Sequence, residues 1–362
     1  MTTALLEDTT RDALWSGAVI DADVHANVPG LGALFAHMSP VWVEGIKERG
    51  WRGPISVGLA YPPGSPTTSR PEWRRDRAVP ASQLSWLQQD VLDPWRSEAA
   101  ILNCYSGVDS IRHPDLAQAY ASAVNNWLIE EWLGRDERLH GSIVIPARDP
   151  IAAAREIDRV GAHPRVRQVL LPVRAERLYG QRYFNPIYEA AVRNDLVVGI
   201  TWGGTAEDAP SPTGFASWHA EEVAAETQLY LSHLTSMILE GTFSKFPSLR
   251  VTVMEGGFLW VPVWAWGVNK KWKGLRREVP WLQKTPFETL RDHVRFTVAP
   301  AALGPEEHTA RTIEWLGPDN LLMFATDYPH RRDDDIGTLL KVVPEGHRAD
   351  LMGGTARDWY GL

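Results

Sequence analysis

The sequence predicts an α/β fold in which eight parallel strands close into a (β/α)8 barrel of the TIM type. Two observations predict it. Eight short apolar runs alternate with helical segments along the chain, and most of these runs are continuous rather than alternating in polarity. Continuous apolar runs are typical of strands buried on both faces, as parallel strands between helices are. A parallel sheet closed on itself is the simplest architecture that satisfies both observations.

The first predicted strand, residues 18–25, ends in an unusual polar pattern. Asp23 and His25 are two residues apart, so their side chains point to the same side of a strand. A carboxylate and an imidazole at the end of a buried strand indicate metal ligands or acid/base groups. The alternative is an aspartate that caps the following turn beside a surface histidine.

Residues 26–97 form a long region without clear periodicity, punctuated by prolines and glycines. Such a region is usually disordered or a functional lid, and its aromatic content is too high for a solvated linker. We therefore expect a lid-like excursion over the C-terminal rim of the barrel, inserted in a single domain that spans residues 1–362. Its tryptophans are Trp42, Trp51, Trp73 and Trp86.

The rest of the chain is regular. The remaining apolar runs predict strands at residues 99–104, 139–146, 166–172, 196–202, 249–255, 294–298 and 320–326. Helical spacing predicts helices at residues 114–133, 150–160, 185–194, 218–243, 260–277, 306–316 and, for the most part, 337–360. Asp149-Pro150 and Asn185-Pro186 each supply a cap residue and a first-turn proline.

A doubly wound open sheet is the runner-up architecture. It would require a glycine-rich phosphate loop after the first strand, and residues 26–29 read Ala-Asn-Val-Pro instead. The length of 362 residues suits one large barrel or two ordinary domains. We therefore favour the closed barrel.

Composition narrows the class of protein. The net charge of −8 argues against a nucleic-acid surface, and no apolar run is long enough to cross a membrane. One cysteine, Cys104, excludes an intrachain disulfide and a cysteine-rich zinc site. Residues 1–15 lack the features of a secretory leader, so we expect a cytoplasmic protein. The 17 tryptophans suit an aromatic-lined pocket, a subunit interface, or both.

Ionisable side chains follow three of the predicted strands at their carboxyl ends, where barrels of this type keep their active sites. Asp23 and His25 end the first strand, Glu255 ends the sixth, and Asp327 follows the eighth, with His330 three residues later. Carboxylates with imidazole suit a borderline divalent ion such as zinc or manganese. Such an ion would activate water or polarise a substrate carbonyl or carboxylate.

Four more residues at this rim are predicted to contact the substrate. Thr201 and Trp202 end the fifth strand, while Arg148 and Arg174 follow the third and fourth strands. An arginine here could hold a substrate carboxylate through two parallel hydrogen bonds. The alternative is a solvent-exposed arginine at each helix start.

Residues 20–25, Ile-Asp-Ala-Asp-Val-His, resemble the opening motif of the amidohydrolase-related family. This branch of the amidohydrolase superfamily includes aminocarboxymuconate-semialdehyde decarboxylase and related aromatic-acid decarboxylases. The resemblance covers essentially the whole chain and implies a distorted eight-stranded barrel that forms homo-oligomers. Further similar stretches follow in the same order at residues 240–243, 246–251, 255–257, 325–330 and 356–362.

The resemblance implies that Asp23, His25 and Asp327 bind one divalent metal ion. It also implies an acid/base role for Glu255, which stands where the family often has a histidine. A further histidine ligand normally ends the fifth strand, and Thr201 stands there instead. The remaining set is harder and more anionic, which favours manganese or magnesium over tightly bound zinc, or leaves no metal at all.

Three functions fit these residues. The leading hypothesis is a metal-dependent enzyme that hydrolyses or non-oxidatively decarboxylates a small, aromatic substrate bearing a carboxylate or amide, with Glu255, Asp327 and His330 as catalytic residues. The second is a repurposed tailoring enzyme without metal, in which His25, Glu255 and Asp327 act as acid/base groups. The third is a non-catalytic binding protein. We expect a small-molecule substrate and a homodimer, with no nucleic-acid or membrane partner.

Overall fold

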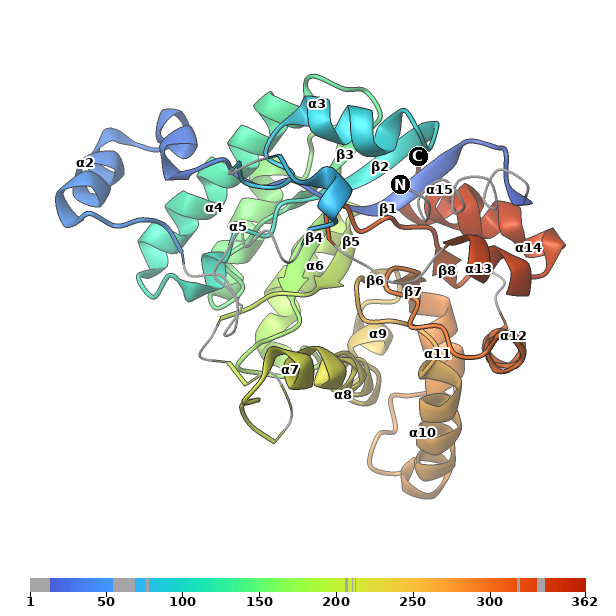
Figure 1. The fold of residues 1–362 in the computed structure, drawn as a ribbon. Coiled ribbons are helices and arrows are strands. Elements are labelled where there is room, and N and C mark those ends of the chain that lie inside the picture. Colours follow the sequence, from blue (N-terminus) through green and yellow to red (C-terminus); the bar gives the residue numbers. More distant parts are fainter. Residues whose placement is uncertain are drawn as a thin grey trace.

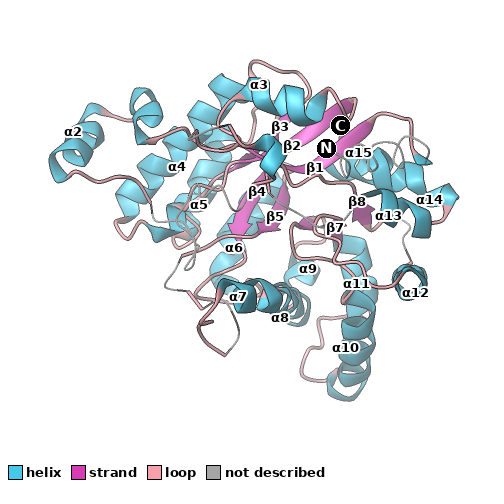
Figure 2. Ribbon diagram, viewed as in Figure 1, coloured by secondary structure: helices cyan, strands magenta, loops and turns pink. Residues whose placement is uncertain are grey.

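The computed structural model describes residues 14–54, 69–75, 78–205, 208–209, 211, 213–317, 320–330 and 336–362. Eight parallel strands, hydrogen-bonded in sequence order, form one sheet at its centre (Figure 2). They are β1 (Val19–His25), β2 (Ser97–Asn103), β3 (Leu139–Ile143), β4 (Val166–Pro172), β5 (Val197–Thr201), β6 (Val251–Val253), β7 (Val294–Thr297) and β8 (Leu322–Met323).

Backbone hydrogen bonds between β1 and the chain after β8 close this sheet. The Ala22 N–H donates to the Phe324 carbonyl at 2.9 Å, and the His25 N–H donates to the Tyr328 carbonyl at 2.8 Å. The register of β1 against β2 shifts twice, so the barrel is distorted. The predicted (β/α)8 barrel is thereby confirmed.

Helices surround the barrel and follow the strands (Figure 1). The larger ones are α4 (Pro114–Leu128), α5 (Pro150–Val160), α6 (Asn185–Arg193), α8 (Thr227–Leu239), α10 (Val261–Leu275), α11 (Pro286–His293) and α12 (Glu306–Leu316). Shorter ones are α7 (His219–Ala225), α9 (Thr242–Lys245), α13 (Ile336–Val342), α14 (Glu345–Ala349) and α15 (Thr355–Tyr360). Among the described helices, none has both the length and the apolar character to cross a bilayer.

The main core lies between the sheet and the helices. Val169 and Leu171 of β4 share one buried apolar cluster with Ile157 of α5 and Ile187 of α6. This is the arrangement that continuous apolar strands require, because their outward faces must also be buried. The core therefore fixes the strands, and their carboxyl ends hold the site.

One of the two predicted helix caps is confirmed. The Asp149 carboxylate accepts hydrogen bonds from the Ile151 and Ala152 N–H groups at the start of α5. The prediction for Asn185 is wrong: it is the first residue inside α6, and Phe184 holds the cap position without a side-chain hydrogen bond. The reason is the 3-10 turn before α6, which already brings Phe184 into a helical backbone conformation.

Strands β6 and β8 end earlier than predicted, at Val253 and Met323. Beyond them Glu255 and Asp327 have φ angles of 61° and 53°, in the left-handed region that residues other than glycine seldom adopt. Such strain persists where the surroundings enforce it, and it gathers at functional sites. Here it turns two carboxylate residues out of the strand direction at the barrel mouth.

The excursion after β1 is less irregular than predicted, because residues 26–97 include α2 (Pro40–Arg49) and α3 (Leu84–Leu87). The α2 helix stands at the outer edge of the molecule (Figure 1). The part at residues 69–75 packs against the chain after β8, where the Trp73 ring lies 4.9 Å from that of Tyr328. Residues 55–68 lie outside the described residues, so a lid over the whole rim stays a prediction.

Candidate metal centre

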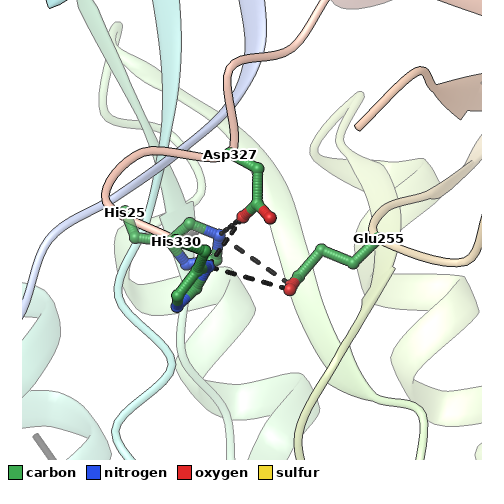
Figure 3. Close-up of side chains that lie close together, drawn as sticks. All are labelled: His25, Glu255, Asp327 and His330. Carbon is green, nitrogen blue, oxygen red and sulfur yellow. Dashed lines mark hydrogen bonds and ion pairs between the residues drawn. The ribbon is translucent and has the colours of Figure 1, made fainter. Parts of the chain in front are cut away.

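Four side chains from three separate elements converge at the barrel mouth (Figure 3). His25 ends β1, Glu255 follows β6, and Asp327 and His330 follow β8. Each offers one ligand atom, and these atoms all lie within 4.8 Å of one another. The gathering that the strand ends predicted is therefore present, while the roles of the individual residues remain predictions.

The Nε2 atom of His25 lies among three carboxylates. It is 2.9 Å from Oδ1 of Asp327, 3.2 Å from Oδ1 of Asp23 and 3.8 Å from Oε1 of Glu255. Burial disfavours the charged imidazole, but these carboxylates outweigh burial and hold the pKa of His25 well above its ordinary value. So many buried negative groups around one nitrogen need a cation there, either a proton or a metal ion.

His330 is the more exposed of the two histidines. Its Nδ1 lies 2.8 Å from Oδ1 of Asp327 and 3.9 Å from Oε2 of Glu255, and its side chain is 30% exposed against 9% for His25. The two imidazole rings meet edge to face, with centroids 4.5 Å apart. His330 thus connects the buried carboxylates with the solvent side of the site.

Glu255 is held by its neighbours on β5 and β7. The Thr201 hydroxyl donates a hydrogen bond of 2.7 Å to Oε1 of Glu255, and the Glu255 N–H donates to the Thr297 hydroxyl at 3.3 Å. Burial, followed by the charge of Asp327, raises the pKa of Glu255. A raised pKa keeps the carboxyl protonated closer to neutral pH, which is what a general acid requires.

Asp23 has one satisfied and one unsatisfied carboxylate oxygen. Its Oδ1 accepts a hydrogen bond of 2.7 Å from the side-chain amide of Asn103. Its Oδ2 is buried and has no hydrogen-bond partner among the described residues. A buried carboxylate oxygen without a donor fits a divalent cation, because a cation would supply the missing partner.

Sequence reasoning missed the role of Asp21. Its carboxylate accepts a hydrogen bond of 2.6 Å from the Thr326 hydroxyl and one of 3.1 Å from the Asp23 N–H. Burial raises the pKa of Asp21 to about 7. The hydrogen bond from Thr326 connects β1 to the residue before Asp327. It therefore fixes the distance between the site residues on β1 and those that follow β8. The alternation of residues 21, 23 and 25 was the available signal.

Two ligand sets fit this geometry. The sequence predicts Asp23, His25 and Asp327, whereas among the described residues the ligand atoms found within 4.8 Å of one another belong to His25, Glu255, Asp327 and His330. His25 and Asp327 are common to both sets. In each set oxygen donors equal or outnumber nitrogen donors, which suits manganese at least as well as zinc.

The two rim arginines are already paired with acidic side chains. Arg148 lies 3.0 Å from Asp208 and 2.8 Å from Glu176. Arg174 is fully buried, pairs with Glu222 of α7 and stacks on the Trp202 ring, 5.0 Å from its centroid. Neither is a freely exposed helix-start arginine, and their contact with substrate stays a prediction.

These arginines line a narrow cleft outside the carboxylate cluster. The enclosed space in it, about 30 Å³, holds roughly two water molecules. The lining residues are Asp109, Ala147, Arg148, Pro172, Arg174, Ala175, Glu176, Arg177, Tyr179, Tyr183, Phe184 and Asp208.

Comparison with solved structures gives the same fold. An amidohydrolase from Mycobacterium avium subsp. paratuberculosis is 19% identical and superposes with a TM-score of 0.72, over 96% of this chain and 99% of that one. A 5-carboxyvanillate decarboxylase from Novosphingobium aromaticivorans, with bound manganese and 3-methoxy-4-hydroxy-5-nitrobenzoic acid, is 18% identical with a TM-score of 0.68, over 95% and 97%. A dihydroxybenzoic acid decarboxylase from Polaromonas, with manganese and 2-nitroresorcinol, is 16% identical with a TM-score of 0.67, over 96% and 98%.

Sequence comparison defines the family. A search of the curated proteins found no match. The amidohydrolase family profile, by contrast, matches residues 20–362, from the first strand to the last residue. This match contains every residue of the candidate metal centre, and the chain therefore belongs to the amidohydrolase family.

Proposed function

We propose that this chain is a divalent-metal-dependent carboxy-lyase that removes CO2 from a small aromatic acid. The observation that carries the proposal is the convergence of His25, Glu255, Asp327 and His330 at the barrel mouth. The reaction class is supported by structural neighbours that are decarboxylases holding manganese and aromatic ligands. A purely structural use of the site is disfavoured, because burying several carboxylates together has a large desolvation cost without a compensating cation.

The metal and the protein have separate parts in this proposal. A divalent ion at His25 and Asp327, with Asp23 beside them, would supply a Lewis acid that binds substrate oxygens. The side chains do the rest. Trp202 follows Thr201, the last residue of β5, and its ring contacts Arg174; we expect its aromatic face to suit a flat substrate. Arg174 and Arg148 could meet a substrate carboxylate only by giving up part of their present ion pairs.

Glu255 is the proposed proton donor. Its proton adds to the ring carbon that bears the carboxylate, and the bond between that carbon and the carboxylate then breaks. The electron pair of the broken bond restores the aromatic ring, and CO2 leaves. The Thr201 hydroxyl orients the Glu255 carboxyl for this transfer. His330, which is partly exposed, returns a proton from solvent.

A homodimer in the cytoplasm completes the proposal. On α10 and α12 the rings of Trp266 and Trp315 lie edge to face at 5.2 Å, and both side chains are exposed. Exposed tryptophans of this kind are enriched at subunit interfaces. The single cysteine suits a reducing compartment.

The test is a turnover screen of the protein loaded with manganese or zinc, using hydroxylated benzoic acids and matched aromatic amides. Release of CO2 from an acid supports decarboxylation, and release of ammonia or an amine from an amide supports hydrolysis instead. Glu255→Gln and Asp327→Asn are expected to abolish turnover, while Glu314→Gln on the exposed face of α12 serves as the control. If both site variants keep full turnover, the proposed roles are wrong.

A further inference from the structure

A buried line of polar side chains runs from the last helix, α15, to Asp23 in the candidate metal centre. Three hydrogen bonds form its central part. The Tyr360 hydroxyl donates to Oε1 of Gln168 at 2.9 Å, and Nε2 of Gln168 donates to Oδ1 of Asn103 at 3.2 Å. Nδ2 of Asn103 then donates to Oδ1 of Asp23 at 2.7 Å. The line therefore connects α15, β4, β2 and β1.

Hydrogen bonds also extend this line beyond Tyr360, and they have the same direction of donation. Nε1 of Trp359 donates to the Thr252 hydroxyl at 3.1 Å, and the Thr252 and Tyr360 hydroxyls are 3.1 Å apart. Because the only proton of the Tyr360 hydroxyl goes to Gln168, Thr252 must donate to Tyr360. Every donor in the line thus points toward Asp23.

A side branch supports the middle of the line. The Ser142 hydroxyl donates to Oδ1 of Asn103 at 2.6 Å and accepts from Nε2 of Gln168 at 3.0 Å. Gly199 of β5 leaves room for this crossing, since a Cβ atom there would lie 2.5 Å from Cδ of Gln168. The neighbouring strand therefore has no side chain where the glutamine crosses.

Because the line is buried, the shared direction of its hydrogen bonds affects the strength of the bond to Asp23. Asp23, Asn103, Gln168 and Thr252 are completely buried, and Tyr360 is 3% exposed. In such a low-dielectric interior, hydrogen bonds in series polarise one another, so aligned donors strengthen the last bond onto the carboxylate. That bond fixes Oδ1 of Asp23, which lies 3.2 Å from Nε2 of His25, while Oδ2 is buried and has no hydrogen-bond partner among the described residues.

We propose that Tyr360 is a positioning residue for the metal centre: through Gln168 and Asn103 it orients Asp23 and sets the affinity for the divalent ion. This inference rests on the metal dependence proposed above. Groups that hydrogen-bond to metal ligands commonly change metal affinity by about 10- to 100-fold when removed. Two side chains, those of Gln168 and Asn103, separate Tyr360 from Asp23, so the lower end of that range is expected.

The test is calorimetric titration of the metal-free protein with Mn²⁺. Tyr360→Phe keeps the ring and removes the hydroxyl, and it is expected to weaken Mn²⁺ binding about tenfold with unchanged stoichiometry. The matched control is Tyr188→Phe, which also removes a buried tyrosine hydroxyl, here one that donates to the Tyr179 carbonyl at 2.6 Å. The control is expected to lose stability by a similar amount and to keep wild-type affinity.

A double substitution tests the route. If Asn103 transmits the effect, Tyr360→Phe causes no further loss of affinity in an Asn103→Ala background. Should Tyr360→Phe not fold, Thr252→Val removes the preceding hydrogen bond and is expected to weaken Mn²⁺ binding in the same direction.

The outcomes separate the two proposals. If the wild-type protein binds Mn²⁺, and Tyr360→Phe and Tyr188→Phe bind it with equal affinity, the inference about Tyr360 is wrong. The metal-dependent function is then unaffected. Failure of the wild-type protein to bind Mn²⁺ or Zn²⁺ under any loading overturns the metal dependence, and the inference with it.

Discussion

The hydroxyl of Thr201 donates a hydrogen bond of 2.7 Å to Oε1 of Glu255. Thr201 ends β5, where the family resemblance leads one to expect a histidine ligand. In this chain the position contacts the proposed general acid instead. Because Thr201 is completely buried, water cannot replace its hydrogen bond without a rearrangement of the site.

Substitution of Thr201 is therefore expected to affect proton transfer more than metal binding. Thr201→Val keeps the shape and removes the hydroxyl, so we expect kcat to fall roughly 5- to 150-fold. This corresponds to a loss of about 1–3 kcal/mol of transition-state stabilisation. Metal content should not change. Thr201→Ser keeps the hydroxyl and should retain most of the activity. Equal losses in kcat for the two variants would show that the hydroxyl is not the reason.

Metal content distinguishes the two ligand sets. If Asp23, His25 and Asp327 hold the ion, Asp23→Asn lowers the metal content of the purified protein and Glu255→Gln leaves it near one ion per chain. If Glu255 and His330 complete the set instead, Glu255→Gln lowers the metal content and Asp23→Asn leaves it near one ion per chain. Asp327→Asn should lose the ion in both cases. Elemental mass spectrometry of the variants after manganese loading is the measurement.

Bound metal should stabilise the fold. A ligand that binds only the folded state at one hundred times its Kd adds about 2.7 kcal/mol to the free energy of unfolding. We expect Mn²⁺ to raise the Tm of the metal-free protein by a few degrees, and a chelator to reverse the rise. Asp327→Asn should abolish the Mn²⁺-dependent rise. An equal rise in that variant would place the stabilising ion elsewhere.

Acid should destabilise the fold through His233, which is remote from the metal centre in sequence and lies on α8. The Tyr179 N–H donates to its Nδ1 at 3.2 Å, and its Nε2 lies 2.8 Å from the Val173 carbonyl. Burial lowers the pKa of His233 to about 4, below its value of about 6.5 in the unfolded chain. Between these values the unfolded state binds the extra proton, so stability falls as the pH falls from about 6.5 to 4.

The contribution of His233 is at most about 3 kcal/mol over that window. His233→Gln should lose this part of the pH dependence, while His308→Gln on the exposed face of α12 should keep it. Urea unfolding of the metal-free proteins at several pH values measures it. If the free energy of unfolding of His233→Gln depends on pH as steeply as that of the wild type, His233 is not the cause.

Local pattern was sufficient for the order of the elements and for the approximate place of the site. The number of strands follows from apolar periodicity, and a parallel barrel gathers the carboxyl ends of its strands on one rim. Asp23, His25, Glu255 and Asp327 could therefore be brought together without coordinates. The prediction for Asn185 failed because a cap depends on how the preceding turn enters the helix.

The amino-acid sequence by itself determined the barrel, its family and the residue types at its mouth. Only the tertiary structure decided which partner each of them has. Arg174 pairs with Glu222, Thr201 contacts Glu255, and Tyr360 bonds to Gln168, which is 192 residues away in sequence. The physical reason is that periodicity records which face of a strand or helix is buried, whereas hydrogen bonds and ion pairs depend on atoms meeting within about 3 Å after the chain has closed.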